Sequence, residues 1–398
     1  MKALPTPAKR GDLLRARQQL KMACTPERYV RGATRQFYDW LESGEGTRLS
    51  EGPEIWICGD CHVGNIGPIA NHKGQIALEI RDLDQTVIGN PAHDLVRLGL
   101  SLASSARGSA LSGVATAQML ECLIAGYTQA FAKDFAEDDL TVPKAVRRSL
   151  KLSKAATWRS LAEDRLEDVE PTIPLGKRFW PLSATERKAI EAFAKEEDLR
   201  QLVTRLRGRK NDATVELVDA AYWVKGCSSL GLLRLALLMK IKGTGKAEHC
   251  LVDVKEAVKS WAPAAETARM PRDNARRVVE GARALSPSLG ERMLATHFSG
   301  HAVFVRELLP QDLKLDIEHL THKQARHTAR FLGAVVGCAH ARQMDGSTRK
   351  AWLRELDRHS TKAVDAPSWL WLSVVDLLAR HERAYLEHCW RYGFKQAA

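Results

Sequence analysis

Apolar residues recur every three or four positions in the first and last parts of the chain, which is the spacing of an amphipathic helix. The helices predicted before residue 210 are Gly11–Cys24, Pro26–Leu41, Asp94–Ala106, Leu111–Lys133, Val142–Lys154 and Thr185–Arg207. Those predicted after residue 260 are Ala264–Leu285, His322–Arg342, Thr348–Ser360 and Trp369–Trp390. Thr25, and either Ser183 or Thr185, are expected to cap the helices that follow them, because their side-chain oxygens can accept the first free N–H groups.

Shorter runs rich in aliphatic residues predict strands. Glu54–Cys58 is expected to pair with Gln75–Ile80 in a hairpin whose turn is Asn71–Gly74. Three consecutive strands are expected to form a meander, and two more follow them. These five strands are Glu216–Lys225, Leu232–Lys242, Ala247–Lys255, Met293–Phe298 and His301–Leu308. Helices and strands are thus segregated along the chain, which predicts an α+β fold.

Polar side chains follow both strands of the predicted hairpin. Asp60, His62 and Asn65 come after the first strand, and Asp82 and Asp84 come after the second. Both groups are therefore expected near the same edge of the hairpin. Phosphoryl transfer needs a carboxylate that receives the proton of the nucleophile, together with oxygen ligands that hold magnesium against phosphates. The two segments predict such a site, and a pair of solvated acidic loops is the alternative.

The first of these loops also fits two other patterns. Cys58–His62 matches the CxxCH pattern of c-type haem attachment, but that chemistry needs export, and Met1–Pro5 begins no apolar signal segment. A redox CxxC is disfavoured because Cys58 lies in a predicted strand and not at the start of a helix, where its thiolate would be stabilised.

The predicted meander carries groups suited to binding phosphates. Its first turn, Gly226–Gly231, is built of small residues, so backbone N–H groups there can approach phosphates. The residues expected to contact the nucleotide are Gly226, Ser228, Ser229, Gly231, Lys255 and Arg306. Lys255 alternates with apolar residues and therefore points away from their face, either toward phosphates or into solvent. Glu280, on the next helix, could pair with Lys255, as a helix Glu does in protein kinases. Glu266 competes for that place.

The order GDxHxxN, then DxD, then GNPAxDL resembles the catalytic and metal-binding loops of aminoglycoside and choline kinase-like phosphotransferases. The resemblance implies that Asp60 is the catalytic base, that Asn65 and Asp82 bind magnesium, and that Asp94 anchors the loop. His62 is kept, whereas Cys58 stands where that superfamily usually has a histidine. Asp84 is expected either to support the metal ligands from behind or to bind a second metal ion, and His62 is expected to act in catalysis by shaping the loop or steadying the developing charge.

The phosphate-binding strands follow the catalytic loops, which inverts the order found in kinases and resembles a circular permutation. This order is similar to the bacterial domain of unknown function 2252 family. The similar segments are Tyr29–Ala33, Gly59–Gly67, Asp82–Asp84, Val254–Ala257, Arg277–Gly281, Phe304–Leu308 and Ala339–Arg342. In the last segment, His340 and Arg342 could line a substrate pocket or be a core and a surface residue.

The resemblances imply a kinase-like two-lobe fold, permuted and with extra helices. Residues 1–210 would form a mainly helical part of the large lobe that carries the catalytic and metal-binding loops. Residues 211–315 would form the small nucleotide-binding lobe, and residues 316–398 would complete the large lobe. ATP and Mg²⁺ are the expected cofactors.

Composition narrows the partners. The 398 residues carry a net charge of +12, which calls for an anionic partner. No basic cluster is interleaved with aromatic residues, so a nucleotide is favoured over nucleic acid. Eight scattered cysteines fit a reducing cytoplasm, and no apolar run is long enough to span a membrane.

The expected function is an ATP- and Mg²⁺-dependent phosphotransferase that acts on a hydroxyl of a small molecule or protein. The alternatives are a catalytically inactive nucleotide-binding regulator and a protein nucleotidyltransferase that moves AMP. The sequence leaves the acceptor open among a sugar, an amino alcohol, an antibiotic and a protein side chain.

Overall fold

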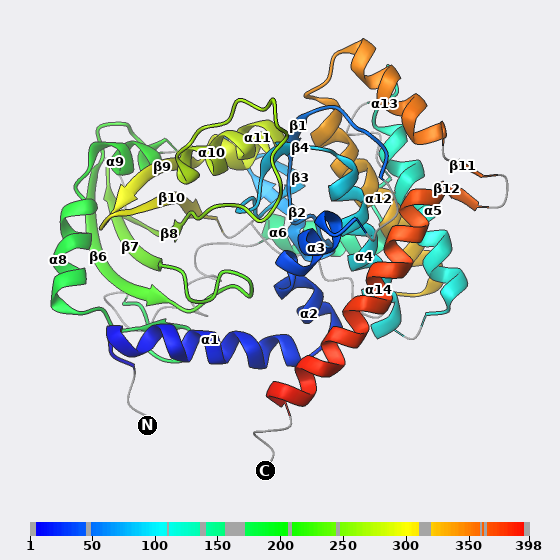
Figure 1. The fold of residues 1–398 in the computed structure, drawn as a ribbon. Coiled ribbons are helices and arrows are strands. Elements are labelled where there is room, and N and C mark those ends of the chain that lie inside the picture. The colour runs from blue at the N-terminus through cyan, green and yellow to red at the C-terminus, as the bar shows by residue number, and fades with distance from the viewer. Residues whose placement is uncertain are drawn as a thin grey trace.

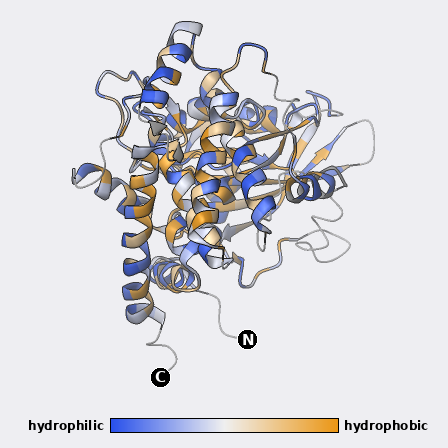
Figure 2. Ribbon diagram, turned by 90° about the vertical axis from the view of Figure 1, so that its right-hand side faces the viewer, coloured by the Kyte–Doolittle hydropathy of each residue, from blue (hydrophilic) through white to orange (hydrophobic). Residues whose placement is uncertain are grey.

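The computed structural model describes residues 5–44, 49–109, 111–135, 141–155, 172–205, 209–243, 247–309, 320–358, 360–361 and 364–393. These residues form an α+β protein, as predicted, in which a six-stranded sheet stands beside a larger helical part (Figure 1). Hydrophilic and hydrophobic residues alternate along the helices, as the apolar spacing of the sequence requires (Figure 2). None of the described helices is long and apolar enough to cross a bilayer.

The large sheet is antiparallel throughout, with the strand order β5-β6-β7-β8-β10-β9. Its strands are β5 (Phe179–Trp180), β6 (Thr214–Trp223), β7 (Arg234–Lys242), β8 (Glu248–Glu256), β9 (Met293–Phe298) and β10 (His301–Leu308). The predicted meander and the two later strands are confirmed. In the register, Lys255 lies between Arg234 and Phe304, and Asp253 lies opposite Arg306.

The two faces of the sheet differ, because successive residues of a strand point to opposite sides. One face is apolar and is covered by α1 (Pro7–Ala23), α8 (Ala184–Phe193) and α9 (Glu197–Thr204). On the other face, Asp253 and Lys255 are buried and charged. The predicted helix Thr185–Arg207 is thus divided into α8 and α9, and its residues 206 and 207 lie outside the described ranges. Ser183 caps α8 with a capping box.

Most helices belong to the helical part. They are α2 (Pro26–Gly32), α3 (Thr34–Glu42), α4 (Ala92–Gly108), α5 (Gly113–Gln129), α6 (Lys144–Ala155), α10 (Asn274–Leu285), α11 (Pro287–Gly290), α12 (His322–Ala341), α13 (Gly346–Arg358) and α14 (Ser368–His388). A 3₁₀ turn (Val63–Asn65) and a π turn (Cys389–Gly393) complete the set. Helices α5 and α12 pack backbone to backbone: a Cβ on Gly126 would lie 1.8 Å from the Arg330 carbonyl oxygen.

Two predicted helices are shorter than expected. Pro26–Leu41 is interrupted at Ala33, although Thr25 caps its first half as predicted. Ala264–Leu285 begins only at Asn274, where the Asp273 side chain accepts the Arg276 N–H and so caps the helix. In both cases the start of the helix is set by a local cap or by a residue that interrupts the helix, and not by the spacing of the apolar residues.

The predicted hairpin of Glu54–Cys58 with Gln75–Ile80 is wrong. The first strand, β1 (Ile55–Ile57), pairs with β4 (Val87–Gly89). The second, β3 (Ile76–Ile80), pairs with β2 (Ile66–Ala70) across the Asn71–Gly74 turn. Strand β2 contains Gly67 and Pro68, which are uncommon inside strands, and the sequence pattern therefore did not predict it. A third small sheet pairs β11 (Ser360–Thr361) with β12 (Val364–Pro367).

Candidate active site

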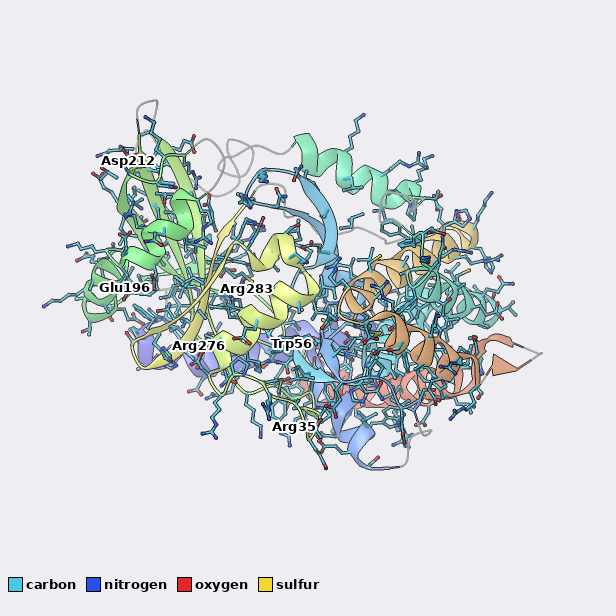
Figure 3. All side chains as sticks on the ribbon, turned by 90° about the horizontal axis from the view of Figure 1, so that it is seen from above. Arg35, Trp56, Glu196, Asp212, Arg276 and Arg283 are labelled. Carbon is cyan, nitrogen blue, oxygen red and sulfur yellow. The ribbon has the colours of Figure 1, made fainter. Side chains whose placement is uncertain are left out.

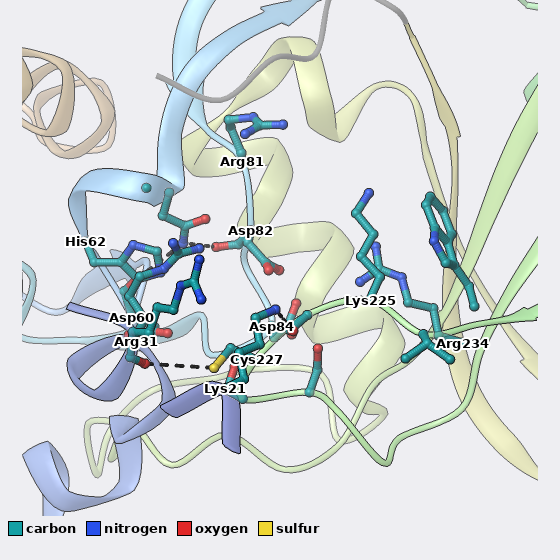
Figure 4. Close-up of a pocket in the computed structure, with 18 of the residues that line it drawn as sticks. Lys21, Arg31, Asp60, His62, Arg81, Asp82, Asp84, Lys225, Cys227 and Arg234 are labelled. Carbon is teal, nitrogen blue, oxygen red and sulfur yellow. Dashed lines mark hydrogen bonds between the residues drawn. The ribbon is translucent and has the colours of Figure 1, made fainter. Parts of the chain in front are cut away.

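A polar cavity of about 590 Å³ is lined by both parts of the molecule (Figure 4). Nine predicted site residues line it: Asp60, His62, Asn65, Asp82, Asp84, Gly226, Ser228, Ser229 and Arg306. Lys255 reaches the carboxylates of Asp82 and Asp84. Gly231 and Glu280 are exposed and lie outside this lining. The cavity therefore unites loops around residues 60 and 82 with strands that follow about 150 residues later.

The correct pairing of the small strands still brings the two acidic loops together. Ile66 of β2 lies opposite Ile80 of β3. The loop that ends at Asn65 and the loop that begins at Arg81 are therefore neighbours, and the Arg81 N–H donates to the Asn65 carbonyl oxygen at 2.8 Å. The predicted convergence was right, but β2 and β3 produce it.

Gly59 lets the loop that carries Asp60 turn at the end of β1. Its φ is +73°, and a Cβ there would lie 2.1 Å from the Gln85 carbonyl oxygen. This close approach packs the Asp60 loop against the segment that follows Asp84. Only glycine satisfies both the backbone conformation and the space.

Gly59→Ala is expected to destabilise the fold by more than the roughly 1–2 kcal/mol cost of a left-handed alanine, because the methyl group also meets Gln85. Gly74→Ala is the matched control: its φ is +77°, and a Cβ there would have no atom within 4 Å. Urea unfolding of both variants measures the difference. Equal losses in the two variants would show that the Gln85 contact is soft.

Asp94, at the start of α4, holds the loop that carries Asp60 through backbone hydrogen bonds. Its carboxylate accepts the backbone N–H groups of Cys58 at 2.7 Å and Gly59 at 3.0 Å. The Nε2–H of His340 donates to the same carboxylate at 3.2 Å. Asp94 is fully buried, so these three donors, from the described part of the chain, compensate for the loss of water around its carboxylate. The position of Asp60 thus depends on a carboxylate in the core.

His340 is a core residue. Its Nδ1 lies 3.0 Å from the Tyr127 hydroxyl, which in turn accepts the Trp352 indole N–H at 2.9 Å. In this series of hydrogen bonds each donor faces an acceptor when the imidazole carries its proton on Nε2. Arg342, by contrast, donates to the Leu285 carbonyl oxygen at 2.9 Å, at the end of α10. Neither residue lines the cavity.

Asp60 is held by an arginine that the sequence did not mark as a partner. Arg97, one turn after Asp94 on α4, donates through Nε to Asp60 Oδ1 at 2.9 Å. It also donates to the Val30 carbonyl oxygen at 2.7 Å. One carboxylate oxygen of Asp60 is therefore fixed, and the residue lines the cavity beside His62. Burial lowers the pKa of His62 to about 4, so the imidazole is neutral at pH 7.

Asn65 joins the two acidic loops. Its amide N–H₂ donates to the carbonyl oxygens of Asp82 at 2.7 Å and of Asp60 at 3.3 Å. The side-chain carbonyl is the atom that this residue can offer to a metal. Asn65, Asp82 and Asp84 together supply the oxygen ligands that magnesium prefers.

Lys255 is 3% exposed and lies against the carboxylates of Asp82 and Asp84. Its Nζ is 3.2 Å from Asp82 Oδ1, and it also contacts Asp84. The Asp82 side chain is half exposed to the cavity, and although its recessed position opposes ionisation, Lys255 and Arg306 hold its pKa well below the usual range. Burial and the charge of Asp82 raise the pKa of Asp84 to about 7. The pair therefore shares its negative charge unequally.

The charged face of the sheet continues beyond Lys255. Arg234 forms a two-pronged ion pair with Asp253, at 2.8 and 2.5 Å, and Arg306 lies 3.6 Å from the same carboxylate. Burial opposes ionisation of Asp253, but the two guanidinium groups lower its pKa to about 2. Eight cationic residues line the cavity: Lys21, Arg28, Arg31, Arg81, Arg178, Lys225, Arg234 and Arg306. They outnumber its three carboxylates, so the cavity attracts anions.

The predicted pairing of Glu280 with Lys255 is not formed. Glu280 is an exposed residue of α10. Arg276 and Arg283 of the same helix are exposed as well (Figure 3). Glu266 is exposed as well. Helix α10 instead contributes Arg277, which donates to the carbonyl oxygens of Asp84 at 3.0 Å and Val258 at 2.9 Å. The sequence signal for this role was an arginine in the apolar stripe of an amphipathic helix.

The small-residue turn between β6 and β7 faces α1. Gly226 and Gly231 both have φ near +107°, a conformation that favours glycine. The Lys21 ammonium donates to the Gly226 carbonyl oxygen at 2.6 Å, and the Gln18 amide donates to the Ser228 carbonyl oxygen at 3.3 Å. The turn thus forms one wall of the cavity, and its phosphate-binding role stays a prediction.

The two cysteines of the loop are buried beside Asp94. Cys58 and Cys61 are fully buried, which leaves no room for haem attachment. Their sulfur atoms and the Asp94 carboxylate lie within 4.8 Å of one another. However, Asp94 already accepts three hydrogen bonds, and burial raises the pKa of Cys58 well above its usual range. The thiols pack the loop.

Comparison with known proteins identifies the chain at the level of a family. No curated protein and no solved structure matches it. Residues 11–391 match the family described as "Uncharacterized protein conserved in bacteria (DUF2252)". The match includes every residue of the cavity described above and nearly the whole length of the chain. The chain therefore belongs to the DUF2252 family.

Proposed function

We propose that this protein is an ATP- and Mg²⁺-dependent phosphotransferase that acts on a hydroxyl group. The observation that carries the proposal is the contact of Lys255 with Asp82 and Asp84 in an anion-attracting cavity. Lys255 and Asp82 are 173 residues apart in the chain. Phosphoryl transfer relies on positioning and on neutralising charge, and it needs carboxylates for magnesium beside cations for phosphates.

The residues present fit magnesium. Asn65, Asp82 and Asp84 offer one amide and two carboxylate groups at the wall of the cavity, which suits a hard cation that also keeps water and phosphate ligands. A bound magnesium ion would draw charge from the phosphate oxygens. Lys255, which neutralises the same carboxylates, is then placed to bind phosphates. Arg306 and the turn around Gly226 complete the proposed nucleotide half of the site.

Asp60 is the proposed base. The acceptor hydroxyl forms a bond to the terminal phosphorus as the bond from that phosphorus to ADP breaks, and the hydroxyl proton passes to Asp60. Arg97 holds one oxygen of the carboxylate at 2.9 Å, so the group is oriented before the acceptor arrives. The order of these segments supports a permuted kinase-like fold as part of the proposal.

The proposal is tested by calorimetry of ATP binding with and without Mg²⁺. Wild type is expected to bind ATP only with the metal, and Asp82→Ala and Lys255→Ala are expected to weaken binding at least tenfold. Lys242→Ala is the control, because Lys242 is a half-exposed strand lysine paired with Glu216. Absence of binding in wild type would overturn the proposal.

The fate of labelled ATP separates the remaining alternatives. Transfer of the γ-phosphate label to an acceptor supports the phosphotransferase. Transfer of the α-phosphate label would identify AMP transfer instead. Tight binding without consumption of ATP across broad acceptor sets would identify a regulator.

The affinity for Mg²⁺ is expected to depend on pH through Asp84. A metal competes with a proton for a carboxylate, so binding should weaken below the pKa of about 7 and level off above it. The expected loss is about tenfold per pH unit between pH 7 and 5. His62, with a pKa of about 4, stays neutral over this range. Calorimetry of Mg²⁺ binding at several pH values tests this.

The control variant is Asp84→Asn, which should bind Mg²⁺ more weakly and without this pH dependence. A wild-type affinity for Mg²⁺ that is constant from pH 5 to 8 would contradict the assignment.

A further inference from the structure

Six of the eight cations that line the cavity form two groups, and one of these groups adjoins the proposed base. Arg234 and Arg306 belong to the sheet, and Lys225 follows β6. Lys21 ends α1, and Arg28 and Arg31 belong to α2. Figure 4 shows Arg31 near Asp60 and His62, away from Lys225 and Arg234. The second group is not needed for the nucleotide half of the site proposed above.

Arg31 lies directly over the catalytic loop. A Cβ on Gly64 would lie 3.2–3.4 Å from its guanidinium atoms, and Gly64 stands between His62 and Asn65 in the chain. The Arg31 charge also helps to lower the pKa of His62. The side chain is 26% exposed, and its carboxylate neighbour Glu27 is at 3.9 Å, which is a weak pairing. Its Nε is buried and has no hydrogen-bond partner among the residues that the structure describes.

The acceptor must approach this place, because its hydroxyl has to come within hydrogen-bonding distance of Asp60. The carboxylates that line the cavity are Asp60, Asp82 and Asp84, and all three have proposed roles in the chemistry or the metal site. Among the described lining residues, no acidic group is left to pair with an ammonium group. A cationic acceptor would meet Arg31, Arg28 and Lys21 and be repelled.

We propose that the acceptor is a small hydroxyl compound that carries a phosphate or carboxylate group, and that this anion binds Arg31 beside Asp60, with Arg28 and Lys21 at the rim. This inference rests on the proposed phosphotransferase function. It disfavours amino alcohols and aminoglycosides as acceptors. Arg31 is a binding residue in this scheme, and the proton and phosphoryl group move as described for Asp60.

The test uses inorganic phosphate as the probe and protein loaded with Mg²⁺ and a non-hydrolysable ATP analogue. Calorimetry should show phosphate binding on top of the analogue. Arg31→Gln should weaken phosphate binding at least tenfold and leave the affinity for the analogue within twofold. Arg31→Lys, which keeps the charge, should retain part of the binding. Arg35→Gln is the control for the lost charge, because the Arg35 side chain is 66% exposed and covers Trp261 outside the cavity.

Acetate serves as a second probe. Binding of phosphate but not acetate would indicate a phosphate-bearing acceptor, and binding of both would admit carboxylates. If phosphate displaces the analogue or does not bind the loaded protein, or if Arg31→Gln weakens the analogue as much as phosphate, the anionic-acceptor assignment is overturned. Failure of wild type to bind the analogue at all would instead overturn the phosphotransferase proposal.

Discussion

Asp60→Asn is expected to bind Mg²⁺ and ATP as wild type does and to lose turnover by about 100- to 10,000-fold, the usual contribution of a positioned base. The substitution keeps the shape of the side chain, and an asparagine carbonyl can still accept the Arg97 Nε–H that now reaches Asp60 Oδ1 at 2.9 Å. What is lost is the capacity to take up a proton. Release of ADP in a coupled assay measures turnover, and calorimetry measures binding.

The control for this variant is Asp39→Asn, because the Asp39 side chain is 59% exposed on α3 and outside the cavity. Removing the charge of Asp60 also leaves Arg97 without its carboxylate, so thermal unfolding has to accompany the kinetics. A variant that is folded, binds ATP and turns over at a near-normal rate would remove Asp60 from its proposed role.

Asp94→Ala is expected to destabilise the protein by about 3–5 kcal/mol, the range seen when one partner of a buried charged network is removed. The substitution leaves the Cys58 and Gly59 N–H groups and the His340 Nε2–H without their acceptor in the core. Each buried donor that loses its partner costs about 1–3 kcal/mol. Because these donors belong to the loop that carries Asp60, activity should fall with stability.

Urea unfolding measures this loss, and Asp39→Ala is a matched control, since an exposed aspartate should change stability by less than about 1 kcal/mol. Asp94→Asn is the sharper variant: it keeps one acceptor oxygen but places an amide N–H₂ against donors. A loss in Asp94→Ala no larger than in the control would mean that water satisfies the freed groups.

Strand patterns with clear ends were the part of the fold that the sequence predicted best. Met293–Phe298 and His301–Leu308 have the predicted bounds, because a two-residue turn separates two alternating runs. Lys255 was found by the same reasoning, since alternation on a strand determines the face of a side chain. Strand pairing was harder: β1 has three residues, too few to specify a partner.

Some site residues could not be predicted because their roles depend on tertiary contacts. Arg97 donates to Asp60 because α4 packs against the loop that carries Asp60. Glu280 has the right residue type for pairing with Lys255, but its side chain is exposed on α10, and the buried Arg277 occupies the inner position. His340 lies on an apolar helix face, and its sequence pattern fits a core position and a pocket position equally well.

The N-terminal helix α1 connects the large sheet to the C-terminal helix α14 and lines the cavity through Lys21. Near its beginning, Leu14 packs into the core of the sheet and Arg10 pairs with Glu186 at 2.5 Å. At its end, the carbonyl oxygens of Gln19 and Ala23 accept hydrogen bonds from His388 and Tyr385. A helix of 17 residues is a rod of about 25 Å. The sheet and α14 are therefore joined by one rigid element, and we expect them to separate only if one end of this helix detaches.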